Sequence, residues 1–62
     1  MNNVLLKAIV TKRYEVELVE TEEHKYMIKR VTADTVNFSE SFTDYHSASY
    51  VFDLTVEELE GN

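Results

Sequence analysis

The sequence predicts a small α+β domain, a three-stranded antiparallel meander with one C-terminal helix packed on a face of the sheet. Apolar and polar residues alternate in three stretches, as in half-buried strands. The last third instead carries apolar residues at helical spacing together with capping residues. The 62 residues form at most one domain, 1–62, and a chain of this length buries only about 60% of its unfolded surface. It contains no cysteine, so stability must come from an efficient core or from self-association.

The first predicted strand contains the stretch YEVELV, residues 14–19. Its apolar side chains face one way and its carboxylates the other (Tyr14, Val16 and Leu18 against Glu15 and Glu17). The same parity continues backwards through Leu6, Ala8 and Val10. We therefore predict one long strand, bent near Lys12 and Arg13, and a one-turn helix over residues 4–10 is the less favoured alternative.

Two further strands follow. The polar stretch 20–24 predicts a loop of three to five residues, because it lacks the Asn-Gly pair of a tight turn. In strand 25–31, Tyr26 and Ile28 are expected to face the core, and Met27 and Val31 to face outward. After a turn at 32–34, strand 35–42 is expected to direct Val36, Phe38 and Phe42 inward. The apolar residues left for the second sheet face suggest that something covers it (Ile9, Val19, Met27 and Val31).

The stretch 42–59 is compatible with two structures. We favour one helix from Asp44 to Glu60, with Thr43 or Ser41 as its cap, Asp44 in its first turn and Gly61 as its C-terminal cap. Such a helix directs four side chains to the core (Tyr45, Ala48, Phe52 and Leu59). The alternative is a short helix, 44–49, followed by a fourth strand over 50–57, because that stretch is rich in strand formers.

Charge is divided unevenly along the chain. All six basic residues lie in the first thirty, together with five acids, so this part has a net charge of +1. Residues 31–62 contain seven acids and no Lys or Arg, a net charge of −7, and the total is −6. An acidic surface repels phosphates, so we expect no direct nucleic acid binding. It attracts partners with basic surfaces.

The sequence shows no pattern typical of an enzyme or a metal site. His24 and His46 are the only histidines, and they lack the spacing of a metal site, so we expect no metal and no cofactor. One glycine excludes a phosphate-binding loop, and no serine lies in a nucleophile elbow. The chain has no apolar run of about 20 residues and no signal-peptide pattern at its start. We therefore expect a non-enzymatic cytoplasmic protein without a membrane segment.

These properties favour a protein-binding module. The leading hypothesis is a small acidic inhibitor, of the kind phages make, that occupies a basic nucleic-acid-binding surface of a partner enzyme. Carboxylates along a helix can imitate a row of phosphates, and an exposed tyrosine adds contact energy. The predicted partner-binding residues are Glu40, Asp44, Tyr50, Asp53, Glu57, Glu58 and Glu60. The alternative hypothesis is a structural or assembly module that acts through self-association, for example as a homodimer.

The layout resembles a known type of module. Three strands followed by a capped helix that begins SESFTDYHSAS resemble the arm-type DNA-binding domains of phage integrases. The resemblance implies the fold alone, since those domains use basic sheet faces and this chain is acidic. In size and acidity the chain is also similar to short phage-encoded inhibitors of host enzymes, which implies a blocking role.

Overall fold

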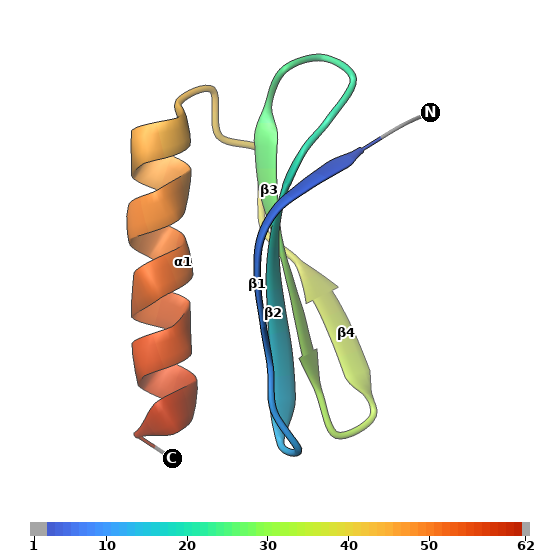
Figure 1. Ribbon diagram of the computed structural model, residues 1–62, viewed down its shortest axis with the longest axis vertical. Coiled ribbons are helices and arrows are strands. Elements are labelled where there is room, and N and C mark those ends of the chain that lie inside the picture. The colour runs from blue at the N-terminus through green and yellow to red at the C-terminus, as the bar shows by residue number, and fades with distance from the viewer. Residues whose placement is uncertain (1–2, 62) are drawn as a thin grey trace.

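The computed structural model describes residues 3–61 and shows a four-stranded antiparallel sheet with one helix along one of its faces (Figure 1). The strands are β1 (Val4–Val10), β2 (Tyr14–Glu20), β3 (Tyr26–Thr32) and β4 (Thr35–Phe38), and they lie in the order β1-β2-β3-β4. The helix α1 (Tyr45–Glu60) contacts β2 and β3. The predicted α+β meander with a packed C-terminal helix is confirmed, and the sheet has one strand more than predicted.

The additional strand arises from a turn at residues 11–13. The Thr11 hydroxyl oxygen accepts hydrogen bonds from the N–H groups of Arg13 and Tyr14, both at 3.1 Å. The Thr11 N–H in turn donates to the Tyr14 carbonyl at 2.8 Å. A threonine side chain thus organises a turn that contains neither glycine nor proline. The prediction of one long bent strand is wrong, because β1 folds back on β2 at this point.

This turn also decides which side chains of β1 face the helix. Lys7 lies opposite Leu18 and Ile9 opposite Val16, so both are on the helix side of the sheet. Ala8 and Val10 lie opposite glutamates of β2, on the outer side. Leu6 falls where the register shifts between Leu5 and Lys7, and it is 38% exposed. The core positions predicted for Leu6, Ala8 and Val10 are therefore wrong, as is the outward position predicted for Ile9.

The strands β3 and β4 are joined by Ala33 and Asp34, and Ala33 has a positive φ of 40°. Val36 lies opposite Val31, and Phe38 lies opposite Lys29. Both therefore lie on the outer side, where they are 53% and 60% exposed, and their predicted core positions are wrong. Alternation groups residues onto one face of a strand but does not say which face meets the helix.

The predicted positions in β2 and β3 are confirmed. Ile28 is buried opposite Leu18, and Tyr26 packs against the core. Met27 and Val31 share the outer side with Val19 and Glu15, their partners on β2. The loop 21–25 has the predicted length, and its bend uses a left-handed residue, His24, with a φ of 61°.

The helix is continuous from Tyr45 to Glu60, so the alternative with a strand over 50–57 is excluded. Its N-cap is Asp44, not Thr43 or Ser41, because the Asp44 carboxylate accepts hydrogen bonds from the N–H and hydroxyl of Ser47 at 2.9 and 3.0 Å. Gly61 is the C-cap, as predicted. The buried core is Tyr14, Val16, Leu18, Ile28, Ala48 and Phe52.

Three other predicted core residues lie at the margin of this cluster. Phe42 and Leu59 are partly buried and pack against it. Tyr45 is 42% exposed, so its predicted core position is wrong. Its ring instead meets Tyr26 edge-on, with the two centroids 5.8 Å apart. The first turn of α1 therefore contacts β3 through these two rings, at the edge of the core.

Candidate interaction surfaces

Three of the predicted partner-binding carboxylates hold the helix in place. Asp44 caps α1, and the hydrogen bonds from the backbone and side chain of Ser47 lower its pKa. Glu58 lies 3.6 Å from the Arg30 guanidinium of β3. Glu60 accepts a hydrogen bond of 2.5 Å from the Tyr14 hydroxyl, and this bond, followed by burial, raises the pKa of Tyr14. Asp44 thus stabilises the start of α1 from within, whereas Glu58 and Glu60 connect its C-terminal end to β3 and β2.

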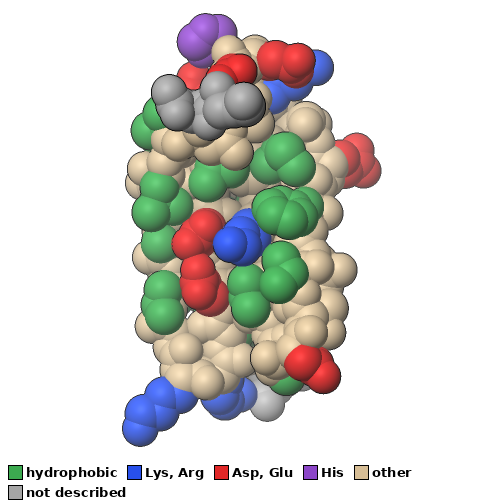
Figure 2. All heavy atoms as spheres, turned by 90° about the vertical axis from the view of Figure 1, so that its right-hand side faces the viewer, with side chains coloured by type: hydrophobic (Ala, Val, Ile, Leu, Met, Phe, Trp, Pro, Cys, Tyr) green, Lys and Arg blue, Asp and Glu red, His purple; other side chains and the backbone are tan. Residues whose placement is uncertain are grey.

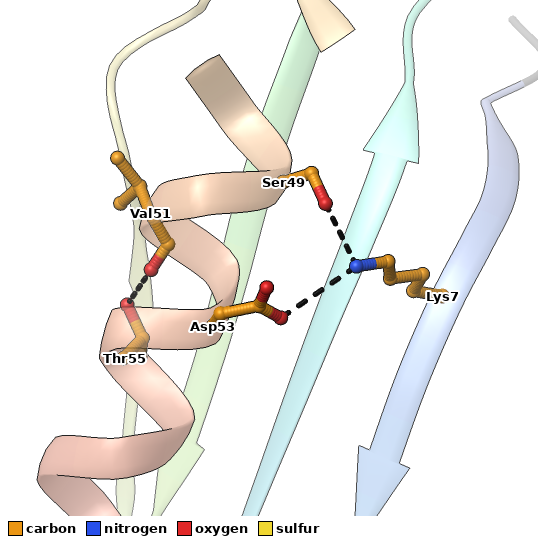
Figure 3. A network of polar contacts seen from close by, with 5 residues as sticks. All are labelled: Lys7, Ser49, Val51, Asp53 and Thr55. Atoms are coloured by element: carbon orange, nitrogen blue, oxygen red, sulfur yellow. Dashed lines mark hydrogen bonds and ion pairs between the residues drawn. The ribbon is translucent and has the colours of Figure 1, made fainter. Parts of the chain in front are cut away.

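A fourth predicted residue, Asp53, belongs to a polar cluster between β1 and α1 (Figure 3). The Lys7 ammonium donates to the Ser49 hydroxyl at 2.8 Å and lies 3.6 Å from the Asp53 carboxylate. The same ammonium lies 5.0 Å from the centroid of the Phe52 ring, a cation–π arrangement. The Asp53 side chain is nevertheless 71% exposed, so much of its carboxylate faces solvent.

The remaining predicted residues are exposed. Tyr50, Asp53 and Glu57 lie three and four residues apart on α1 and therefore share one face of the helix. We call these three residues the acidic stripe. Tyr50 is 65% exposed, so most of its ring is accessible to a partner. Glu40 is also exposed, in the loop between β4 and α1, and so lies outside the stripe.

A second surface is the side of the sheet that faces away from α1, which we call the outer sheet face. Figure 2 shows apolar side chains around a small charged centre on this face. In register, Lys29 lies opposite Glu17, and Glu15 follows on the same side of β2. Around them are apolar residues of all four strands: Leu5, Ala8, Val10, Val19, Met27, Val31, Val36 and Phe38.

The charged centre of the outer sheet face contains two carboxyl groups close together. A hydrogen bond with Glu15 raises the pKa of Glu17, and desolvation and the charge of Glu15 act in the same direction, while Lys29 opposes them. Two adjacent carboxyl groups that share a proton are a familiar cause of such a shift. Any partner that covers this face has to accommodate two acids and one base.

A third surface is the free edge of β1. No strand lies beyond β1 among residues 3–61. Its large apolar side chains are exposed on both sides of the strand: Val4 53%, Leu5 55%, Leu6 38%, Ile9 37% and Val10 69%. The sequence prediction missed this edge because it placed these residues within a longer strand. The available signal was the run VLLKAIV, which is apolar at both parities.

A hollow lies between β3, β4 and α1, lined by Ile28, Arg30, Asn37, Phe38, Ser39, Val51 and Thr55. Its two hydroxyl groups serve the backbone. The Ser39 hydroxyl accepts from the Ile28 N–H at 2.9 Å and donates to the Glu40 carbonyl at 2.8 Å. The Thr55 hydroxyl donates to the Val51 carbonyl at 2.8 Å (Figure 3). Both hydroxyls are therefore held in structural hydrogen bonds.

The histidines lie apart from these surfaces or at their margin. His24 lies in the loop 21–25 with its Nδ1 3.2 Å from Glu20, and His46 is exposed in the first turn of α1. Within residues 3–61, no group of three His, Asp or Glu side chains is placed to hold a metal ion. In the same range, α1 is too short and too polar to cross a membrane. Comparison of the chain with protein-family models, curated proteins and solved structures gave no match.

Proposed function

We propose that this chain is a non-enzymatic protein-binding module that applies its acidic stripe to a basic, nucleic-acid-binding surface of a partner enzyme and so inhibits it. The observation that carries the proposal is Tyr50, an aromatic side chain 65% exposed on the solvent side of α1. Asp53 and Glu57 follow it, three and seven residues later, on the same helix face. Tyrosine is one of the residues enriched among the hot spots of protein interfaces.

The distribution of charge supports the same proposal. The seven acids of residues 31–62 lie in the turn before β4, in the loop after β4 and on α1, and β4 itself carries no charge. Lys7 and Arg30 of the sheet pair with Asp53 and Glu58, so part of the helix charge is compensated within the fold. Glu57 has an exposed side chain, and the Asp53 side chain is 71% exposed. An acidic surface of this kind accelerates encounter with a basic partner at low salt.

The test uses the heparin-binding proteins of a cell extract, a fraction enriched in basic nucleic-acid-binding enzymes, and the immobilised chain as bait. We expect the chain to retain a basic enzyme at low salt and to release it when duplex DNA or RNA is added, because both compete for one surface. The double variant Asp53→Lys/Glu57→Lys should slow association about tenfold or more. Glu23→Lys/Asp34→Lys changes the net charge equally, away from the stripe, and should have a much smaller effect.

Three outcomes would contradict this function. Retention that survives reversal of the acidic stripe would show that another surface binds the partner. Retention that nucleic acid cannot displace would show that the partner is held outside its nucleic-acid-binding surface. Retention lost equally in both double variants would point to general charge attraction, which also contradicts a specific role of the stripe.

A second candidate function is that of an assembly module acting through self-association. The free apolar edge of β1 favours it, because exposed apolar edge strands pair readily with other strands. Salt separates the two functions. Binding through the acidic stripe weakens as salt rises, whereas association of two copies that each carry a charge of −6 strengthens when their repulsion is screened.

A further inference from the structure

We propose that β1 of one copy pairs antiparallel with β1 of a second copy, so that one continuous sheet runs through both. The proposal rests on the self-association candidate above and is independent of the acidic stripe. It assigns the partner, the strand and the symmetry of the contact.

The edge of β1 is open to pairing. In an edge strand, alternate backbone N–H and C=O groups point away from the sheet and can bond to another strand. Edges are commonly protected by outward charges, by proline or by shortness. β1 has seven residues and no proline, and its one charged residue is Lys7. The Lys7 ammonium is turned to Ser49 and Asp53 on the helix side. One protective feature is present, the register shift between Leu5 and Lys7, and residues 7–10 beyond it pair regularly with β2.

The opposite edge of the sheet is a poorer site. β4 has four residues and includes the polar Thr35 and Asn37. A contact between β1 of one copy and β4 of the next would also be head-to-tail, and such contacts extend into open chains unless a ring closes. Pairing of β1 with β1 is two-fold symmetric and closes at the dimer. This contact also uses the longer and more apolar of the two edges.

Charge favours pairing of two copies through β1 over stacking of their outer sheet faces. Residues 1–30, which include β1, carry a net charge of +1, and the −7 of the remaining chain lies in the turn before β4, the loop after it and α1. Pairing through β1 thus brings together the least acidic parts of two acidic molecules. Stacking of two outer sheet faces would instead bury Glu15, Glu17 and Lys29 of each copy. Burial of such charges is costly unless each is fully paired.

The apolar side chains of β1 also match a copy of the same strand. Leu5, Ala8 and Val10 lie on the outer side, and Ile9 lies on the helix side. Antiparallel pairing sets apolar residues of one strand beside those of the other on both sides, and such cross-strand pairs stabilise sheets. A domain of 62 residues with six buried side chains gains core area in this way.

The absence of cysteine allows a direct test of the pairing. We would replace Leu5, Leu6, Ala8 and Ile9 by cysteine, one at a time, and oxidise each variant mildly. In a two-fold antiparallel pair one residue lies opposite itself, with the two Cα atoms about 4.5–5.5 Å apart, within the disulfide range of about 4.4–6.8 Å. We expect a covalent dimer at one of these positions and less at its neighbours. Val36→Cys on β4 is the control and should stay monomeric. Stacked sheets lie about 10 Å apart, too far for a disulfide.

A matched pair of charged variants tests the same contact without cross-linking. Ile9→Lys puts a charge on the edge of β1 but not on the outer sheet face, and Phe38→Lys puts one on the outer sheet face but not on β1. Sedimentation velocity from about 1 µM to about 1 mM, the range of moderate to weak affinities, measures the dimer. We expect Ile9→Lys to weaken it about tenfold or more and Phe38→Lys to leave it unchanged. Unfolding curves of both variants confirm that each is folded.

Three outcomes would overturn the proposal: a wild-type chain that is monomeric throughout this range, a dimer that survives Ile9→Lys but not Phe38→Lys, or a disulfide scan with no position above the Val36→Cys control. None of them bears on the acidic stripe, since the dimer is measured without any partner enzyme. Conversely, Glu57→Lys, which leaves the pair between Lys7 and Asp53 in place, can weaken enzyme retention without changing the cysteine cross-link.

Discussion

The neighbouring strands β1 and β2 have the same length but differ in burial, since β2 supplies core residues and β1 is exposed. β1, with the sequence VLLKAIV, contains one charged residue, and β2, with the sequence YEVELVE, contains three. Hydrophobicity alone would therefore place β1 in the core. In the structure β2 provides Tyr14, Val16 and Leu18, which are at most 5% exposed, whereas every residue of β1 except Lys7 is exposed.

The difference shows that position under the helix decides burial. α1 contacts β2 and β3, and Phe52 and Ala48 are buried with the inward residues of these two strands. Apolar area contributes about 25 cal/mol per Å² only where water is removed, so the apolar side chains of β1 contribute little to the isolated fold. Their burial is still available to a partner. We therefore assign stability mainly to β2 and association mainly to β1.

The largest expected effect is the loss of stability when a leucine of β2 is truncated, and an apolar residue of β1 serves as the comparison. Leu18→Ala removes a side chain that is 0% exposed and should cost about 2–5 kcal/mol. A domain of this size has about 3–9 kcal/mol in total, so the variant should be close to unfolding. Val10→Ala, at a residue 69% exposed, should change stability by about 0.5 kcal/mol or less. Urea unfolding at a concentration where the chain is monomeric measures both. Comparable losses would contradict the division of roles.

An intermediate effect is expected at Lys7, the residue of β1 that reaches the helix. Lys7→Met keeps an aliphatic chain beside Phe52 but removes the bond to Ser49 and the ion pair with Asp53. Because the Lys7 side chain is one-third exposed, we expect a loss of only about 1 kcal/mol. Lys12→Met in the turn is the matched control and should lie within about 0.5 kcal/mol of wild type. A loss no larger than that of the control would show that β1 is not attached to α1 through this side chain.

The same comparison explains what the sequence can and cannot predict. All six residues that are buried within residues 3–61 were predicted for the core (Tyr14, Val16, Leu18, Ile28, Ala48 and Phe52). In β2 and α1 this was possible because polar residues mark the opposite face. In β1 both faces of the strand carry apolar residues, so the sequence does not indicate which face is buried. The turn before β2 depends on the Thr11 hydroxyl, which replaces the glycine or asparagine that usually signals a turn.

The surfaces were less predictable than the core. The excess of acid in the second half is a property of the sequence, but its use depends on how α1 is seated on the sheet. That seating pairs Glu58 with Arg30 and Asp53 with Lys7, two contacts between residues far apart in the chain. The pair between Lys7 and Asp53 also depends on the β1–β2 turn, since the turn places Lys7 on the helix side of the sheet. No local pattern encodes these pairings.

The smallest expected effect is a pH dependence of the folding stability, caused by the hydrogen bond that joins β2 to the C-terminal end of α1. The Tyr14 hydroxyl donates to the Glu60 carboxylate, and this bond, with burial and the charge of Glu60, holds the pKa of Tyr14 above its ordinary value. The bond requires the protonated phenol, so its contribution is complete below about pH 10, the ordinary pKa of tyrosine. It is lost as the pH rises through the raised pKa of the folded state.

We therefore expect the urea midpoint of the wild type to fall more steeply above about pH 10 than that of Tyr14→Phe. Tyr50→Phe, at an exposed tyrosine of α1, should follow the wild type. If Tyr14→Phe showed the same alkaline slope as the wild type, the phenol would not titrate against Glu60. The attachment of β2 to α1 would then rest on the apolar contacts of Val16 and Leu18 alone, and the difference between β1 and β2 would be purely one of burial.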